Sequence, residues 1–348
     1  MRLRASYALP LLWTEPGPIE ELATYLARVA QEVEEVIVID GSPPPLYQRH
    51  AELLGANARH LPPDPDLAFQ MGKVNGVITA LRNCTQEWVV IADDDVRYGP
   101  TALRRAVELL GEADLVRPQN FFDPLPWHAR WDTARSLLNR VFTGDPEFPV
   151  GDFPGTLAVR RSSFFAAGAY DGDALFENLE LMRTIRAGGG RVITPLDLHV
   201  GRRPPSTEHF LSQRVRQAYD DFAIPARLGA WLAIWPSLLA PGRRRRRVAI
   251  AAATSVALAE VGRRRAGGTT VFPVSGSLLA PAWLLERGTC AWLALGARLR
   301  GGVRYGRGRI RQAATPSRAL RRRYVESPRG SAAGPGDASL SARNPIAL

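Results

Sequence analysis

Three carboxylates in a row follow an apolar run in the stretch EWVVIADDDVRYGP, residues 87–100. Trp88–Ala92 has the composition of a buried strand, so Asp93, Asp94 and Asp95 lie where that strand leaves the core. Adjacent like charges repel, and a divalent cation would relieve the repulsion. In an extended chain Asp93 and Asp95 point to the same side. The spacing therefore predicts a Mg²⁺ or Mn²⁺ site; the alternative is an acidic turn that caps the next helix.

Lys73 is the only lysine among the 45 basic residues, and it lies in the segment GKVNG. An ammonium is a compact point charge that suits a phosphate, so we expect Lys73 to contact a phosphorylated ligand. The alternative is a solvated surface lysine. Asp40 ends another apolar run, VIVID, and we expect it at the same edge of the fold as the three aspartates.

The elements that must position these residues alternate between helix and strand. Helical spacing or composition is found in 19–33, 73–81, 100–110 and 178–187, and strand composition in 36–39, 88–92, 156–159 and 191–193. This alternation predicts an α/β domain with a mostly parallel sheet flanked by helices. In such sheets ligands bind outside the carboxyl ends of the strands, where Asp40 and the aspartate cluster lie.

The character of the chain changes after residue 222. Acidic residues become scarce, and apolar runs at 228–239, 248–258 and 271–299 alternate with arginine clusters. None reaches the roughly 20 uninterrupted apolar residues of a spanning helix. We therefore predict short helices associated with the cytoplasmic face of a membrane; the alternative is a second, soluble helical domain.

The expected organisation is a catalytic domain over 1–222, a hydrophobic and arginine-rich helical region over 223–323, and a disordered tail over 324–348. The net charge of +11 favours an anionic partner: nucleic acid, a phosphorylated substrate or an acidic membrane. The two cysteines, far apart in apolar settings, fit unpaired thiols in a reducing compartment. No secretory signal is evident.

The ordered segments VIVIDGS, GKVNGVITAL, EWVVIADDDV, GTLAVRRSSFFAAGAYDG and QRVRQAY resemble glycosyltransferase family 2, over roughly residues 5–222. The resemblance implies a GT-A fold, a Rossmann-like mixed sheet, and transfer of a sugar from a UDP- or GDP-linked nucleotide sugar. It also implies an inverting, metal-dependent reaction with Mg²⁺ or Mn²⁺. The region after the catalytic domain, with apolar helices and the basic segment GGVRYGRGRI, is similar to that of ceramide glucosyltransferases and bacterial relatives that act on lipids.

The resemblance implies roles for individual residues of this chain. Asp40 resembles the aspartate that contacts the nucleoside, and Lys73 and Asn75 match the family's G-K-x-N segment near the donor. Asp93 and Asp95 match its D-x-D motif, in which the second aspartate holds the metal. Asp94, between them, is placed with the donor-binding residues.

A further segment matches the family's Q-x-x-R-W motif, which engages the diphosphate or the acceptor. Gln213, Arg214 and Arg216 are the residues assigned to it. The tryptophan of that motif is replaced by Gln217.

The sequence departs from the family at the general base. Family members carry Glu-Asp, with the aspartate removing the acceptor proton, whereas this chain has Glu177 followed by Asn178. Because an amide is not a base, either Glu177 or Glu180 takes the role, or the acceptor is already ionised, as a phosphate would be. The alternative is a plain helix start, with Asn178 as the cap and Glu180 favouring the helix dipole.

These observations predict a glycosyltransferase that acts on a lipid or lipid-linked acceptor at the cytoplasmic membrane, with its catalytic domain facing the cytosol and no nucleic acid as partner. One alternative is a GT-A-like nucleotidyltransferase, but the expected glycine-rich phosphate loop is not found at 11–18. The other is a non-catalytic membrane or polyanion-binding protein on a degenerate GT-A scaffold.

Overall fold

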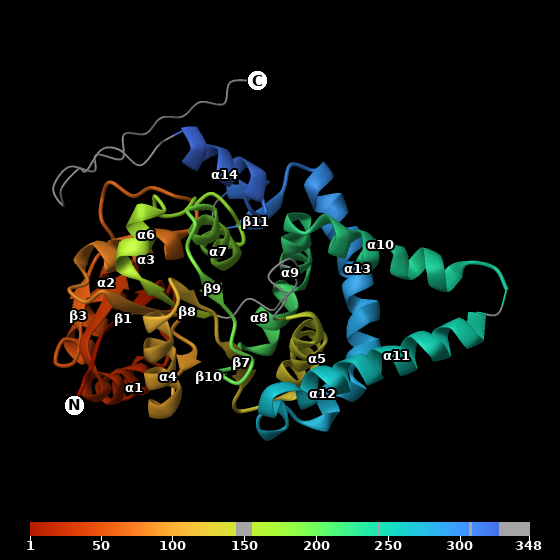
Figure 1. Cartoon of the computed structure of the whole chain (residues 1–348), viewed down its shortest axis with the longest axis horizontal. Coiled ribbons are helices and arrows are strands. Elements are labelled where there is room, and N and C mark those ends of the chain that lie inside the picture. The colour runs from red at the N-terminus through yellow and green to blue at the C-terminus, as the bar shows by residue number, and fades with distance from the viewer. Residues whose placement is uncertain (144–154, 243, 306–307, 327–348) are drawn as a thin grey trace.

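The computed structural model of the chain describes residues 1–143, 155–242, 244–305 and 308–326, arranged as Figure 1 shows. The strands are β1 (Leu3–Leu11), β2 (Val33–Asp40), β3 (Arg59–Leu61), β4 (Trp88–Ala92), β5 (Val96–Arg97), β6 (Leu115–Val116), β7 (Gln119–Phe122), β8 (Thr156–Arg160), β9 (Val192–Ile193), β10 (His199–Arg202), β11 (Val303–Tyr305) and β12 (Gly308–Ile310).

The helices of the described residues follow the same order. They are α1 (Ile19–Glu32), α2 (Pro44–Leu54), α3 (Gly72–Asn83), α4 (Pro100–Glu108), α5 (Trp127–Phe142), α6 (Arg161–Ala166), α7 (Glu177–Ala187), α8 (Thr207–Ser212), α9 (Arg214–Tyr219), α10 (Pro225–Leu239), α11 (Arg244–Arg264), α12 (Val274–Leu278), α13 (Ala280–Leu299) and α14 (Ser317–Glu326). Short 3₁₀ turns are η1 (Leu109–Gly111), η2 (Asp220–Ala223) and η3 (Arg265–Thr270).

The main sheet has seven strands in the order β3-β2-β1-β4-β8-β6-β9. The pairs β2–β3, β1–β2, β1–β4 and β6–β9 are parallel, and β8 runs antiparallel to both β4 and β6. A smaller sheet has the order β5-β10-β7. The predicted mostly parallel α/β sheet is confirmed, and the carboxyl ends of β1, β2 and β4 share one edge.

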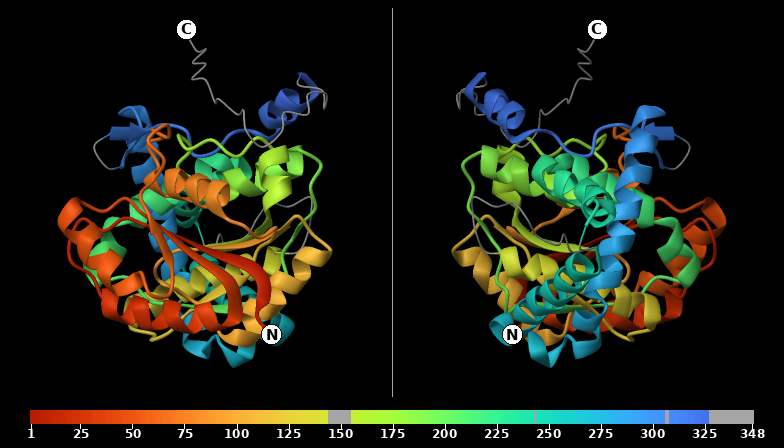
Figure 2. Two further views of the ribbon diagram at one scale, coloured as in Figure 1. Left: turned by 90° about the vertical axis from the view of Figure 1, so that its left-hand side faces the viewer. Right: turned by 90° about the vertical axis from the view of Figure 1, so that its right-hand side faces the viewer.

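Both faces of the main sheet are buried under helices (Figure 2). In β4, Val89 and Ile91 belong to one apolar cluster, with residues of α3 and α7, while Val90 and Ala92 belong to another, with residues of α1 and α4. Such double burial explains why β4 is apolar along its whole length. Because β4 ends in the core, the three aspartates emerge beside the strands on either side of it.

The predicted elements of the first half are confirmed, with small shifts at their ends. The strand at 88–92 has the expected bounds, and the helix at 178–187 begins one residue earlier, at Glu177. The prediction that Asn178 caps this helix is wrong, because the N-cap is Phe176. Strand β1, which pairs with β2 and β4, was not foreseen, because Arg2, Arg4 and Pro10 interrupt its apolar pattern.

The C-terminal third contacts the sheet domain directly. Backbone N–H groups of Leu175 and Phe176, just before α7, donate to the carbonyls of Gln312 and Ala313 at 3.0 and 2.9 Å. Cys290 and Ala294 of α13 belong to the same apolar cluster as the sheet. The division at residue 222 stays a prediction, and contacts cross it.

The predicted tail, 324–348, lies largely outside the described residues. Residues 324–326 are the last turn of α14, so the tail cannot begin at 324.

Helices α10 and α11 extend from the body as a pair, on the side away from the main sheet (Figure 1). The base of α10 packs on α13, and α11 packs on α5. None of the residues of α10 is fully buried. Within the described ranges, no helix is both long enough and apolar enough to cross a bilayer.

Candidate active site

A cavity of about 650 Å³ opens at the carboxyl ends of β1, β2 and β4. It continues between α5, α10 and α13, so both halves of the chain contribute to its wall. Most of the residues predicted for the site line it: Lys73, Asn75, Asp93, Asp94, Asp95, Glu177, Asn178, Gln213 and Arg216. Asp40, Glu180 and Arg214 do not line it, and their side chains make contacts within the protein instead.

Lys73 lies between two carboxylates from distant parts of the chain. Its Nζ is 2.6 Å from Asp93 Oδ1 and 2.9 Å from Glu177 Oε1. Burial lowers the pKa of Lys73, but the two carboxylates raise it by more, so its pKa is above the usual range. Lys73 is therefore a fixed positive charge. In this structure it contacts two carboxylates, and its predicted contact with a phosphate stays a prediction.

Glu177 and Asp93 respond differently to this shared ammonium. Burial raises the pKa of Glu177, but Lys73 and Arg216 lower it by more, so its pKa is below the ordinary value. Burial also raises the pKa of Asp93, and there the attraction of Lys73 does not offset burial and the neighbouring charge of Asp95. A cation near Asp93 and Asp95 would favour their ionised forms.

Asp95 offers the clearest cation ligand of the site. Its Oδ2 accepts a hydrogen bond of 2.6 Å from Arg202 Nε, while its Oδ1 is buried and has no hydrogen-bond partner among the described residues. Asp93 Oδ2 lies 3.9 Å from Arg202 Nη2, so both carboxylates face one guanidinium. A buried carboxylate oxygen without a donor suits a hard cation.

The described residues contain no group of three or more His, Cys, Asp or Glu side chains that could hold a metal. Two carboxylates with an incoming diphosphate are nevertheless the usual environment of Mg²⁺, which keeps water and phosphate ligands. The residues present thus fit the predicted Mg²⁺ or Mn²⁺.

Asp94 and Asn75 hold the walls of the cavity. Asp94 Oδ2 accepts a hydrogen bond of 2.5 Å from Trp13 Nε1, in the loop after β1. Asn75 Nδ2 donates to the carbonyl of Phe69 at 3.1 Å, and its Oδ1 accepts from the N–H of Phe69 at 3.2 Å. Both side chains fix loops at the edge of the sheet, and their predicted contacts with a donor stay predictions.

Asp40 is buried beneath the cavity floor. Its Oδ2 contacts His50 Nδ1 at 2.7 Å and His60 Nε2 at 3.0 Å, and its Oδ1 accepts from the N–H of Ser42 at 2.9 Å. Burial raises the pKa of Asp40, but these hydrogen bonds lower it to about 2. The predicted contact with a nucleoside is not open to this carboxylate in the structure, whereas its neighbours Ile39 and Gly41 line the cavity.

The two carboxylates of the segment expected to carry the general base have different surroundings. Glu177 and Asn178, in the first turn of α7, line the cavity. Glu180 is fully buried elsewhere, and its Oε2 accepts a hydrogen bond of 2.6 Å from the N–H of Thr315. Glu180 joins α7 to the C-terminal segment and is not placed to act as a base.

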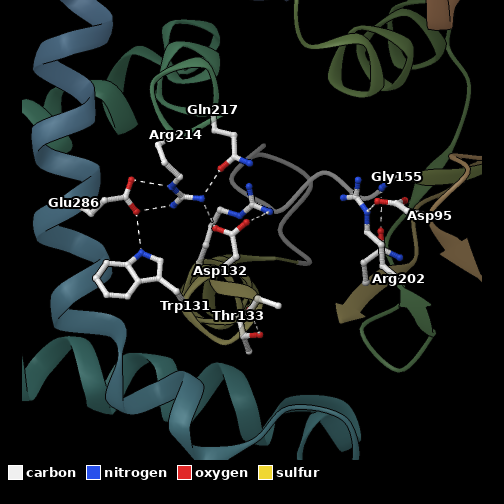
Figure 3. Close-up of polar contacts among 12 residues, drawn as sticks. Asp95, Trp131, Asp132, Thr133, Gly155, Arg202, Arg214, Gln217 and Glu286 are labelled. Atoms are coloured by element: carbon white, nitrogen blue, oxygen red, sulfur yellow. Dashed lines mark hydrogen bonds and ion pairs between the residues drawn. The ribbon is translucent and has the colours of Figure 1, made fainter. Parts of the chain in front are cut away.

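Arg214 and Arg216 have different surroundings, although they are two residues apart. Arg214 Nη1 lies 2.7 Å from Asp132 Oδ1, and its Nη2 lies 2.6 Å from Glu286 Oε2, which also accepts from Trp131 Nε1 (Figure 3). Arg214 thus joins α9 to α5 and α13, and its predicted contact with ligand is not supported.

Arg216 faces the cavity. Its Nη1 donates to Gln213 Oε1 at 2.9 Å, and its guanidinium lies 5.0 Å from the centre of the Tyr305 ring.

Arg202, Asp220 and Arg287 are among the cavity residues that sequence reasoning missed. Arg202, at the end of β10, contacts both aspartates of the D-x-D motif. Burial raises the pKa of Asp220 to about 7, with Arg216 and Arg287 lowering it and Glu177 and Asp221 raising it. The acidic pair DD after QRVRQAY was the only available signal for Asp220, and nothing marked Arg287 among so many arginines.

No protein-family model and no curated protein matches this chain. Similar solved structures include the mannosyltransferase PcManGT of Pyrobaculum calidifontis in complex with GDP-Man and Mn²⁺. It is 20% identical over 84% of this chain and 88% of that chain, with a TM-score of 0.48. Another is glucosyl-3-phosphoglycerate synthase of Mycobacterium tuberculosis with Mn²⁺, UDP and phosphoglyceric acid, 22% identical over 59% of this chain and 72% of that one, with a TM-score of 0.41. Because both TM-scores are below 0.5, these similarities carry no argument about activity. That argument rests on the residues of the cavity.

Proposed function

We propose that this protein is a metal-dependent glycosyltransferase that uses a UDP- or GDP-linked sugar. The observation that carries this proposal is the arrangement of Lys73 and Asp95 at one sheet edge. A fixed ammonium and a buried, unpartnered carboxylate oxygen lie in the same cavity, where a diphosphate and its cation need them. The family 2 motifs give the same assignment from the sequence.

The diphosphate end of the reaction uses the residues of the sheet edge. Asp95 and Asp93 would hold Mg²⁺ or Mn²⁺, which supplies positive charge to the diphosphate when bound. Lys73 and Arg216 line the same cavity and add positive charge to the leaving nucleoside diphosphate. An oxygen of the acceptor attacks the anomeric carbon from the opposite side as the bond to the diphosphate breaks, which inverts the centre.

The proton of an acceptor hydroxyl needs a base within the cavity. Glu177 lies there, but its pKa is lowered and it is bound to Lys73, which makes it a weak base. Asp220 has a pKa of about 7, and its Oδ1 is buried without a hydrogen-bond partner among the described residues. A carboxylate with a pKa near the working pH is suited to accept this proton, so we assign the role to Asp220 in place of the family's aspartate at position 178.

The acceptor we propose is a lipid or a lipid-linked molecule, delivered at the cytoplasmic face of a membrane. Supporting it are Arg244, Arg245 and Arg246, all exposed in the first turn of α11, followed by Val248 and Ile250, which are 44% and 54% exposed. Exposed arginines beside exposed apolar side chains favour an anionic bilayer surface. The N-terminal half of α10 brings Arg227 and Trp231 to the cavity. An acceptor held at a membrane by α10 and α11 would therefore reach the cavity along α10.

The test is calorimetric titration with UDP and with GDP in the presence of Mn²⁺, followed by incubation of membranes with labelled nucleotide sugars and extraction of the lipids. We expect one nucleotide to bind and one lipid band to carry label. Asp95→Asn should remove both, whereas Asp197→Asn, at an exposed site outside the cavity, should leave both unchanged. Binding of neither nucleotide by the wild type, or full activity of Asp95→Asn, would disprove the proposal.

A further inference from the structure

The end of the cavity between α5, α10 and α13 has a chemistry of its own. We call it the arginine end and define it by Arg135, Arg227, Trp231, Trp283 and Arg287, all of which line the cavity. Figure 3 shows Asp132 and Arg214, from the neighbouring helices, well separated from Asp95 and Arg202. The residues of the arginine end belong to α5, α10 and α13, whereas the aspartates proposed to hold the metal follow β4.

Arg287 is the central group of this end. Arg287 is 3% exposed, and its Nε and Nη1 have no hydrogen-bond partner among the described residues. It forms an ion pair with Asp221, but Asp221 Oδ2 is 3.6 Å from Nη1 and therefore too far for a hydrogen bond. Asp221 Oδ1 is engaged by Arg227 Nε at 2.6 Å. A buried guanidinium with two donor nitrogens that lack acceptors is costly unless a ligand satisfies them.

Trp283 supplies a third unused donor on the same helix face. It is 2% exposed, and its Nε1 also lacks a hydrogen-bond partner in the described part of the chain. Residues 283 and 287 are one helical turn apart, so their side chains are neighbours, and the Arg287 guanidinium lies 5.1 Å from the Trp283 ring centre. Trp231 packs edge-on against Trp283 at 5.8 Å and fixes the indole.

The charges around Arg287 also favour an anion. Burial lowers the pKa of Arg287, and the neighbouring cations Arg214 and Arg135 lower it further, while Asp221 and Glu286 raise it; its pKa ends below the usual range. Three of the acids near it, Asp132, Glu286 and Asp221, already contact Arg214, Arg135 or Arg227. Asp220 is also close enough for Arg287 to lower its pKa. The guanidinium therefore shares its carboxylates with other arginines and makes no short contact with any of them.

We propose that the arginine end binds a phosphate group of the acceptor. Arg287 and Trp283 bring together three donor nitrogens that have no acceptor among the described residues: Arg287 Nε and Nη1 and Trp283 Nε1. A phosphate monoester offers three terminal oxygens and about two negative charges to such a set, whereas a carboxylate offers two oxygens and one charge. The phosphate would anchor the acceptor at one end of the cavity while its hydroxyl reaches the sugar at the other. This inference rests on the proposed function for the role of the phosphate, although not for its binding.

Calorimetry in the absence of nucleotide tests the site directly, with glycerol 3-phosphate as the soluble probe and phosphatidylcholine vesicles containing phosphatidic acid as the lipid probe. Binding of the soluble probe assigns a free phosphate ester. Binding of the vesicles alone assigns a lipid headgroup if the cavity variants weaken it; vesicle binding that they leave unchanged is surface binding by α11 and overturns the inference. We expect Arg287→Gln to weaken the binding about tenfold or more, and Trp283→Phe, which keeps the ring and loses Nε1, about threefold to tenfold. Arg264→Gln, exposed and outside the cavity, should leave it unchanged.

Two further measurements separate this inference from the glycosyltransferase assignment. Nucleotide binding with Mn²⁺ is measured for each variant and should stay at the wild-type value, which also shows that the variant is folded; if Arg287→Gln does not fold, Trp283→Phe alone decides. Phosphate binding should persist when nucleotide and Mn²⁺ are saturating. The inference is overturned if neither probe binds the wild type, if both cavity variants bind as well as Arg264→Gln, or if nucleotide displaces the phosphate.

Discussion

Lys73 and Glu177 are 104 positions apart in the sequence, and their side chains meet at 2.9 Å. Each lies in the first turn of its helix, α3 or α7, so the contact joins two helix N-termini at the edge of the sheet. Asp93, which follows β4, completes the group through the same ammonium at 2.6 Å. The contact places one positive charge between two carboxylates in a cavity open to ligand, where a phosphate can exchange with either partner.

Replacing Lys73 by Met tests whether this ammonium supports the fold as well as the ligand. The substitution leaves Asp93 and Glu177 partly buried without their counter-charge, so we expect a loss of about 3 kcal/mol in the free energy of unfolding. Nucleotide binding should fall below detection. Urea denaturation and calorimetry measure the two effects.

A second substitution separates the causes of the instability. Lys73→Met combined with Glu177→Gln removes one of the uncompensated carboxylates, so the double variant should recover part of the lost stability and none of the nucleotide binding. If Lys73→Met were as stable as the wild type, Asp93 and Glu177 would have to be solvated or protonated in the absence of the ammonium.

Arg214 and Arg216 provide a matched pair of substitutions. Arg214→Met breaks buried ion pairs to Asp132 and Glu286, so we expect it to lower the free energy of unfolding by about 3–5 kcal/mol. Arg216→Met removes a cation that faces the cavity, so it should leave stability within about 1 kcal/mol of the wild type and lower turnover about 100-fold. Thermal unfolding and sugar transfer are measured on both; the reverse pattern would refute the assignment.

The arginine pair also shows where sequence reasoning reached its limit. The motif QRVRQAY placed both arginines at the diphosphate, but residues two apart on a helix point to different sides, and only a tertiary structure tells which side faces the cavity. Glu177 and Glu180 are three apart and lie on the same face of α7, so only the tertiary packing shows that Glu177 lines the cavity and Glu180 does not. Strand β4 and helix α3 were predicted well because their apolar patterns and end residues are local.

Features made by distant contacts were not predictable. Asp40 was expected at the ligand because it ends a strand, yet His50 and His60 enclose its carboxylate from α2 and β3. Arg202 and Arg287 carried no local signal, because arginine is common throughout this chain. The composition of the C-terminal region predicts membrane association. Its contacts with the residues before α7 are backbone hydrogen bonds, which a pattern of side chains does not predict.

The acid stability of the protein should depend on Asp40. Its pKa in the folded state, about 2, is below the ordinary value of 3.8, so its ionised form stabilises the fold above about pH 5 and this contribution is lost as the pH falls towards 2. The shift corresponds to about 2 kcal/mol. Urea denaturation between pH 2 and pH 7 should show this loss in the wild type.

The variant Asp40→Asn should be less stable at pH 7 and should lack this part of the pH dependence. Asp197→Asn, at an exposed position, serves as the control and should follow the wild type. If Asp40→Asn kept the full acid sensitivity of the wild type, other carboxylates would be responsible.

The pH dependence of catalysis should report Asp220. A base with a pKa of about 7 must be ionised to accept a proton, so kcat/KM should rise with pH through about 7 and then level off. The groups that act on this carboxyl are Arg216, Arg287, Glu177 and Asp221. Asp220→Asn should lower kcat about 100-fold or more and remove the rise, with nucleotide affinity unchanged. A variant that keeps the same rise would return the role to Glu177 or to an ionised acceptor.

The paired helices α10 and α11 should govern binding to an anionic bilayer. Replacing Arg244, Arg245 and Arg246 by Gln removes three exposed charges, each worth about 1 kcal/mol near an anionic surface, so partitioning onto phosphatidylserine vesicles should weaken about 100-fold. The control replaces Arg318, Arg321 and Arg322, which are exposed on α14, and so changes the net charge equally. Because surface attraction is screened, the difference between the two variants should shrink as salt is raised. Equal loss in both variants would assign the binding to net charge alone, and no loss in either would remove the membrane from the proposed function.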